Sequence, residues 1–170
     1  MGNIISLNAL GQHLSMSNGL TTVFLSTLGL SGTYFAKSED DKRIIIWLLE
    51  KDQSAVGCGT VGFDICEMPW DLADFDRSKQ FLLAAVDGAK QKIGWERLDY
   101  RPNEELLFPC LDQFHYMISQ MTPDMLDQAA IKAWLDESME TPDDPISCGY
   151  PCCPKHQVFL TVFGCHLCND

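Results

Sequence analysis

The chain has 170 residues, and its 12 Lys and Arg against 24 Asp and Glu give a formal net charge of −12. Hydrophobic residues make up 46% of the chain and charged residues 21%, which is typical of a globular domain and excludes a disordered acidic tail. The acidic excess argues against nucleic acid as a partner, because phosphate contacts need a basic surface.

The first 36 residues carry no charge, so we expect this segment to be buried or to lie in an interface. The first charged residue is Lys37, which leaves no basic region typical of a secretory signal, and no apolar run reaches the roughly 18 residues of a membrane span. We therefore expect a cytoplasmic protein without membrane association. In that reducing compartment Cys58, Cys66 and Cys110 should be free, buried thiols.

Apolar spacing predicts a mainly helical domain over residues 1–140, with an α+β arrangement as the alternative. The expected helices cover 20–28, 37–52, 71–93, 103–120 and 123–139. The expected N-caps are Ser17 or Asn18 for the first helix, Ser38 for the second, and Asp71 or Asp74 for the third. Thr122 is the expected N-cap of the fifth helix, with Pro123 as its first residue. Expected ends are Gly29 or Gly32 for the first and Gly94 for the third, while Pro109 should kink or divide the fourth.

Two stretches leave the secondary structure open. Residues 44–49 are apolar on every side, so a buried strand competes with a helix there. Residues 54–70 contain glycines at 57, 59 and 62 and predict an irregular connection with a short strand around 62–65.

Residues 141–170 are predicted to form a linker and a metal-binding tail packed on the helical domain. Five of the eight cysteines lie between 148 and 168, a clustering that indicates a metal rather than a spread disulfide framework. Cys153 and His156 form a C-x2-H pair, and Cys165 and Cys168 form a C-x2-C pair. The β-branched and aromatic stretch 158–163 between them favours an extended arm that brings both pairs together. Thiolates and imidazole suit tetrahedral zinc.

This segment resembles a zinc ribbon or zinc knuckle over residues 152–168. The resemblance implies a structural Zn²⁺ with Cys153, His156, Cys165 and Cys168 as ligands, closed to catalysis because no coordination position is left open. Phe159 and Phe163 are the expected docking contacts. Alternatives remain: Cys152, Cys148 or His166 as a substitute ligand, an iron–sulfur centre using Cys148 and Cys152, or reduced thiols packed against the helices.

Candidate catalytic groups are few. Asp64 and Glu67 flank Cys66 in the glycine-rich stretch, and with His13 or His115 they could form a hydrolase-type site. The competing interpretation is that both carboxylates are solvated. Similarly, His115 lies between Phe114 and Tyr116, a setting more typical of a packed histidine than of a catalytic one.

The distribution of acidic residues gives a further indication of function. Residues 122–144 hold seven carboxylates, with Lys132 as their cation: Asp124, Asp127, Asp136, Glu137, Glu140, Asp143 and Asp144. The pattern fits either a solvated face or a surface complementary to a basic protein, with Trp70, Trp134 and Tyr150 as candidate anchors. In size and charge the chain resembles the small acidic immunity proteins with which bacteria neutralise basic toxins. That resemblance implies a non-catalytic binding protein; a hydrolase and a zinc-containing regulatory adaptor are the alternatives.

Overall fold

The computed structural model describes residues 2–168 and contains, within that range, five α-helices and two small β-sheets. The helices are α1 (Asn18–Phe35), α2 (Glu39–Leu49), α3 (Phe75–Lys90), α4 (Glu104–Ser119) and α5 (Gln128–Glu140). The strands are β1 (Gly2–Leu7), β2 (Gln12–Ser17), β3 (Asp52–Gln53), β4 (Gly59–Thr60) and β5 (Phe63–Asp64). The protein is therefore mainly helical with minor β structure.

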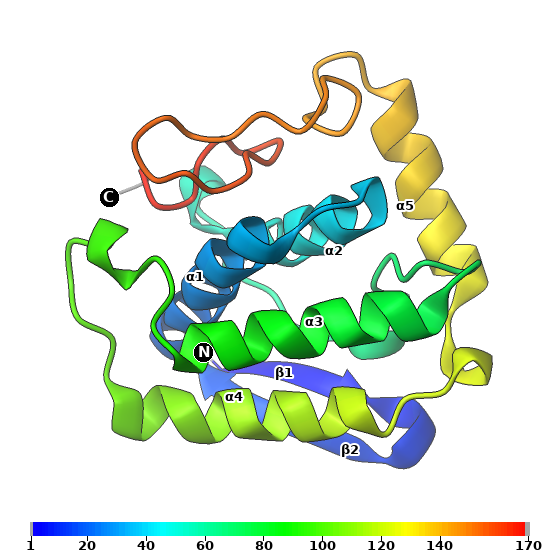
Figure 1. Cartoon of the computed structure of the whole chain (residues 1–170), viewed down its shortest axis with the longest axis horizontal. Coiled ribbons are helices and arrows are strands. Elements are labelled where there is room, and N and C mark those ends of the chain that lie inside the picture. The colour runs from blue at the N-terminus through cyan, green and yellow to red at the C-terminus, as the bar shows by residue number, and fades with distance from the viewer. Residues whose placement is uncertain (1, 169–170) are drawn as a thin grey trace.

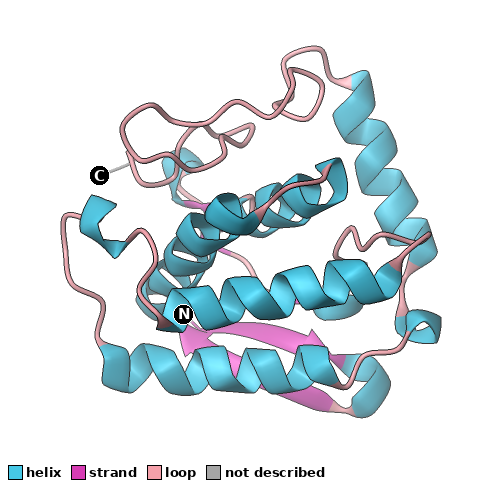
Figure 2. Ribbon diagram, viewed as in Figure 1, coloured by secondary structure: helices cyan, strands magenta, loops and turns pink. Residues whose placement is uncertain are grey.

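The hairpin and the tail lie at opposite ends of the molecule, with α1, α2 and α3 between them and α4 beside the hairpin (Figure 1). Strands β1 and β2 pair antiparallel, and the short β5 adds to β1 in parallel, giving the order β2-β1-β5. Helix α5 runs along one side between the two ends, and the tail is almost entirely loop (Figure 2). None of the helices between residues 2 and 168 combines the length and the hydropathy that crossing a bilayer requires.

The uncharged N-terminal segment supplies much of the core. Helix α1 contacts α2, α3 and α4, and ten of its residues are buried, which explains the absence of charge. The apolar pattern of this segment predicted only a helix, so the hairpin of β1 and β2 was not predicted. The signal for β1 is a period of two: Ile5 and Leu7 are buried, Ile4 between Asn3 and Ile5 is exposed, and the turn uses Gly11 at φ +66°.

Glycines that were expected to end α1 instead allow close packing. A Cβ on Gly29 would lie 2.6 Å from Leu49 Cδ2, and one on Gly32 would overlap Ile45 Cδ1, so α1 continues through both and lies against α2. Residues 44–49 are helical and fully buried because different neighbours cover each side. For example, Phe63 of β5 packs edge-on against Trp47 at 5.0 Å between ring centroids.

Helix caps were predicted with mixed success. Ser17, Ser38 and Asp74 are N-caps as expected, and Ser38 forms a capping box with Asp41. The prediction of Gly94 after α3 was wrong, because Lys92 at φ +65° takes the left-handed position, with Lys92 N and Ile93 N donating to Ala89 and Gly88.

The ends of the later helices also differ in detail from the prediction. Helix α4 begins at its cap Asn103 and passes through Pro109 undivided. Thr122 and Pro123 begin a short 3₁₀ turn, Pro123–Met125, while α5 starts later with Asp127 as its cap. The short strand β5 lies inside the predicted 62–65 stretch.

Candidate metal centre

Cys153, His156, Cys165 and Cys168 come together in the tail, and their donor atoms all lie within 4.8 Å of one another. The His156 Nδ1 atom is 3.7 Å from Cys153 Sγ, 3.6 Å from Cys165 Sγ and 3.3 Å from Cys168 Sγ. The sulfurs of Cys153 and Cys168 are 3.7 Å apart. This Cys3His cluster could hold a metal ion.

The spacing of the donors fits a tetrahedral ion. With metal–sulfur bonds of about 2.3 Å and a metal–nitrogen bond of about 2.0–2.1 Å, the edges of a tetrahedron are about 3.8 Å between sulfurs and about 3.6 Å between sulfur and nitrogen. Three of the observed separations, at 3.6–3.7 Å, are close to those edges; the distance from Cys168 Sγ to His156 Nδ1 is shorter at 3.3 Å, and all four donors lie within 4.8 Å of one another. Zinc is thus compatible with both the donor types and their geometry.

Two backbone turns aim the donors at one point. After Cys153 the chain turns back through Gln157 at φ +52°, with Gln157 N donating to Cys153 O and Cys153 N donating to Val158 O, both at 2.8 Å. A second turn is closed by the bond from Cys168 N to Cys165 O at 3.2 Å. Two isolated bridges accompany these turns, Cys152 with Phe159 and Thr161 with Gly164, so the expected extended arm is present as bridges rather than as a strand in the described residues.

The electrostatics of the thiols depend on the same turns. Burial opposes ionisation of Cys153, but the backbone N–H groups of His156 and Lys155 and the His156 ring lower its pKa to about 6. In contrast, burial raises the pKa of Cys165 to about 12, where the neighbouring thiols of Cys153 and Cys168 add to the effect. Closely spaced thiolates repel one another, and a divalent cation among them removes that repulsion.

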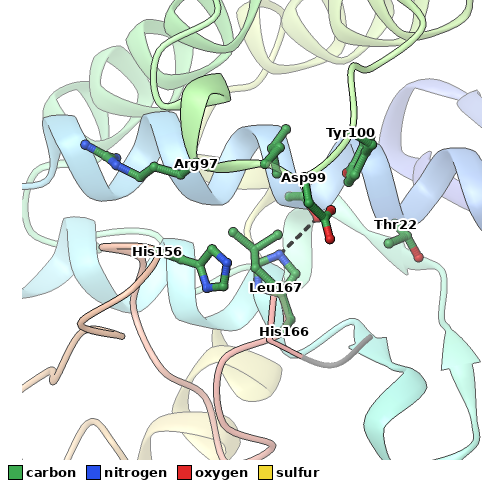
Figure 3. Close-up of a pocket in the computed structure, with 9 residues that line it drawn as sticks. Thr22, Arg97, Asp99, Tyr100, His156, His166 and Leu167 are labelled. Atoms are coloured by element: carbon green, nitrogen blue, oxygen red, sulfur yellow. Dashed lines mark hydrogen bonds between the residues drawn. The ribbon is translucent and has the colours of Figure 1, made fainter.

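The cluster is fastened to α1 by contacts on both sides. Val158 is fully buried and lies over Gly29, and Phe159 N donates to Thr33 Oγ1 at 3.4 Å. His166 Nε2 lies 3.1 Å from Ser26 Oγ (Figure 3). Phe159 is buried, as expected of a docking residue, while Phe163 is only half-buried and Val158 takes the deeper position.

The other candidate ligands point elsewhere. Cys148 and Cys152 are exposed and lie outside the cluster of donor atoms, and His166 contacts Ser26 instead. The free thiols Cys66 and Cys110 are buried as predicted, and burial raises the pKa of Cys66 to about 12. Cys58 was predicted to be buried, but it is exposed in the loop between β3 and β4.

Asp64 accepts hydrogen bonds from residues at the ends of strands β1 and β5. Its carboxylate accepts hydrogen bonds from Ser6 Oγ at 2.9 Å, Asn8 N at 3.0 Å and Cys66 N at 2.9 Å. Burial alone would raise the pKa of Asp64, but these hydrogen bonds lower it below its usual value. His13 is exposed on β2 opposite Ser6, and no hydrogen bond or ion pair of residues 2–168 joins it to Asp64.

His115 is also not the packed residue expected from its aromatic neighbours. It is partly exposed on α4, and its Nε2 lies 3.4 Å from Asp87 Oδ1. The hydrolase-type group of Asp64, Glu67 and a histidine is therefore not joined by any hydrogen bond or ion pair among the described residues.

Of the three aromatic anchors, Trp70 was wrongly predicted. It is buried, and its indole N–H donates to Ile65 O at 2.9 Å. Trp134 and Tyr150 are half-buried: Trp134 Nε1 donates to Glu50 Oε2 at 3.0 Å, and Arg43 Nε donates to the Tyr150 hydroxyl at 3.0 Å. Glu50 itself had no sequence signal, because only the fold brings it beside α5.

Comparison of the chain with models of known protein families, with curated proteins and with solved structures gives no match.

Proposed function

We propose that this protein is a non-catalytic, cytoplasmic binding protein whose tail is held by a structural Zn²⁺ and whose acidic side recognises a basic protein. The four ligands are Cys153, His156, Cys165 and Cys168. Because all four positions of a tetrahedral ion are then taken by protein, the ion stabilises the tail and is closed to substrate.

The observation that carries the binding role is the charge of α5 and the segment after it. Six of the seven carboxylates between 122 and 144 are exposed, and the one cation there, Lys132, already pairs with Asp136 at 2.6 Å. The remaining negative charge has no counter-charge within this segment. Such a field accelerates encounter with a basic partner and selects against acidic ones.

A cavity of about 290 Å³ lies on the same side of the molecule and carries three carboxylates. It is lined by Glu50, Glu137 and Asp144, with Trp134 as an aromatic wall and Val162 from the tail. None of the three carboxylates takes part in an ion pair of the described residues. The cavity suits a lysine or arginine side chain, because its three carboxylates favour a cation and Trp134 adds an aromatic contact.

The test is capture of a basic protein from native lysate, with two variants that change the net charge equally. Glu137→Lys with Glu140→Lys alters the acidic side, and Glu96→Lys with Glu105→Lys alters exposed carboxylates outside it. We expect the first variant to lose a partner that the parent and the second variant retain, and the complex to weaken with added salt. Equal loss in both variants, or capture of acidic proteins, would contradict the proposed binding surface.

A further inference from the structure

A groove of about 420 Å³ lies where the loop before α3 meets α5 (Figure 1). Its apolar lining comes from Leu72 of the loop and from Ala129, Ile131 and Leu135 of α5. The volume falls in the range of roughly 300–1,000 Å³ that is typical of pockets for organic ligands, so it has room for a large side chain.

This groove and the cavity lined by Trp134 and Glu137 lie on different sides of α5. At 3.6 residues per turn, Lys132 of the groove lies about half a turn around the helix from both of those residues. Met139 follows Leu135 by four positions, so it extends the apolar side of the groove along the helix. Helix α5 therefore offers two separate hollows to a partner.

Apolar surface at the groove is exposed to water. Leu72 is 52% exposed and Met139 is 57% exposed, while Leu135 is half-buried. Helix α5 buries Ile131 on the core side, and a solvated helix face would carry polar side chains on the other. Exposed apolar side chains that converge on a hollow are typical of an interaction site.

Exposed carboxylates lie near the groove on both of its segments. On α5, Asp136 lines the groove and Glu140 follows one turn later. On the other segment, Asp74 and Asp76 lie at the start of α3, within four residues of the loop side chain that lines the groove. Lys132 is the one cation among the described lining residues, and it pairs with Asp136 at 2.6 Å. The surroundings of the groove therefore carry an excess of negative charge.

A second copy of the chain and an anionic lipid surface both conflict with these charges. A second copy carries the same net charge of −12 and would bring like charges together, and anionic lipid headgroups would be repelled in the same way. We propose that the groove binds a segment of the basic partner in which a large apolar side chain lies between Lys or Arg residues. This inference rests on the proposed function and specifies the chemistry of the segment that is recognised.

Short peptides test whether the groove needs both the apolar and the basic groups. Isotope-labelled full-length protein is titrated with a blocked peptide in which a leucine lies between two pairs of lysines, and NMR follows the amides of Leu72, Ile131 and Leu135. We expect saturable shifts, about tenfold weaker binding when serine replaces the leucine, and no binding when glutamate replaces the lysines. Absence of saturable shifts, equal affinity for the leucine and serine peptides, or binding of the glutamate peptide would overturn the proposal.

Variants locate the binding in the groove. Leu72→Gln should reduce the preference for the leucine peptide over the serine peptide several-fold, because it removes apolar lining. Leu106→Gln is the matched control, since Leu106 is 58% exposed on α4 and lies outside the groove, and the preference should not change. Glu140→Gln should weaken both peptides alike. An unchanged preference in Leu72→Gln contradicts the site, and so does a dimer of the parent that Leu72→Gln dissociates in sedimentation.

The same variants separate this inference from the proposed function. In the lysate experiment, Leu72→Gln should lose the basic partner that Leu106→Gln retains. If Glu137→Lys with Glu140→Lys loses the partner while Leu72→Gln retains it in full, the acidic side binds and the inference about the groove is wrong. If the parent captures no basic protein, the proposed function fails, and the peptide titrations decide on the groove by themselves.

Discussion

The body over residues 2–140 and the tail over residues 141–168 are held in shape by different means. The body buries large apolar side chains from the hairpin and all five helices in one continuous core. The tail adds little to that core: Ile146, Val158 and Phe159 are its main buried apolar residues besides cysteines. Instead, it gathers four metal donors within 4.8 Å.

Information about structure is therefore distributed differently in the two parts of the chain. In the body the stability comes from many contacts, each of which contributes a small part, so no single position decides the fold. In the tail a stretch of about thirty residues cannot bury enough apolar surface to fold alone, and in the proposed metal centre four residues carry the decisive interaction.

Removal of the metal should give the largest effect, and the effect should stay in the tail. Structural zinc contributes roughly 10–16 kcal/mol of apparent binding free energy in comparable peptides. We expect Cys165→Ser or Cys168→Ser to lower zinc stoichiometry and to accelerate hydrogen exchange at the amides of Cys153 and Leu160, whose hydrogen bonds lie in the tail. Amides of α1 should remain protected.

Cys58→Ser is the matched control for that experiment, because Cys58 is exposed and far along the chain from the cluster. Its zinc content and exchange pattern should equal those of the parent. Undiminished zinc in both ligand variants would contradict the ligand set, and loss of protection throughout α1 would show that the body, too, depends on the metal.

Glu50 tests the boundary between the regions, since its carboxylate shares a cavity with Val162 of the tail. Burial raises its pKa from 4.5 to about 7, and nearby Asp144 adds to this, although the Trp134 hydrogen bond opposes it. The folded protein therefore binds an extra proton between pH 4.5 and 7, and the contribution of Glu50 to stability is lost as pH rises through that window.

Glu50→Gln removes that dependence while keeping an oxygen for Trp134. We expect the difference in the free energy of unfolding, variant minus parent, to increase between pH 4.5 and 7. Above pH 7 this difference should be on the order of 2–3 kcal/mol in favour of the variant. Urea titrations at a series of pH values measure the difference, with metal content checked at each. If the parent and Glu50→Gln showed the same pH dependence of stability, Glu50 would not be the group responsible for it. Glu137→Gln, at an exposed neighbouring carboxylate, should change that pH dependence less than Glu50→Gln does.

Close packing of α1 against α2 should be the most sensitive feature of the body. Gly32→Ala places a methyl group against the buried Ile45 side chain, which overpacks the core. We expect a loss of about 1–3 kcal/mol in urea unfolding. Gly19→Ala, at a helical position with open space around it, should leave stability unchanged or raise it. Equal stability of the two variants would show that the helices do not need the glycine.

What the sequence could predict follows from the same contrast. The four tail cysteine and histidine positions were recognisable because two-residue spacing alone brings each pair together, and the structure then unites both pairs. Most helices of the body were recognisable from apolar period and from local caps such as Ser38 and Asp74, whose partners lie three residues away.

The errors occurred where distant residues decide the outcome. The local sequence predicted that Gly29 or Gly32 would end the first helix. In the structure both are interior positions of α1, where they allow close contact with α2. The hairpin was missed because its alternation is short and lies in an uncharged segment that also suits a buried helix. Trp70 was expected at the surface, and only its neighbour Phe75, at 5.3 Å between ring centroids, and the core around it reveal its burial.

The smallest expected effect concerns the capping box of α2, which tests whether local signals in the body matter singly. Ser38 Oγ accepts from Asp41 N at 3.2 Å, while Asp41 Oδ2 accepts from Ser38 N at 3.3 Å. Ser38→Ala should lower the free energy of unfolding by about 1 kcal/mol, and Ser38→Gly by only a few tenths. Asp41 also pairs with Arg77 of α3 at 2.7 Å, so the start of α2 stays anchored and metal content should not change. A loss well above the effect of Gly32→Ala would mean that the body depends on one cap rather than on its distributed core.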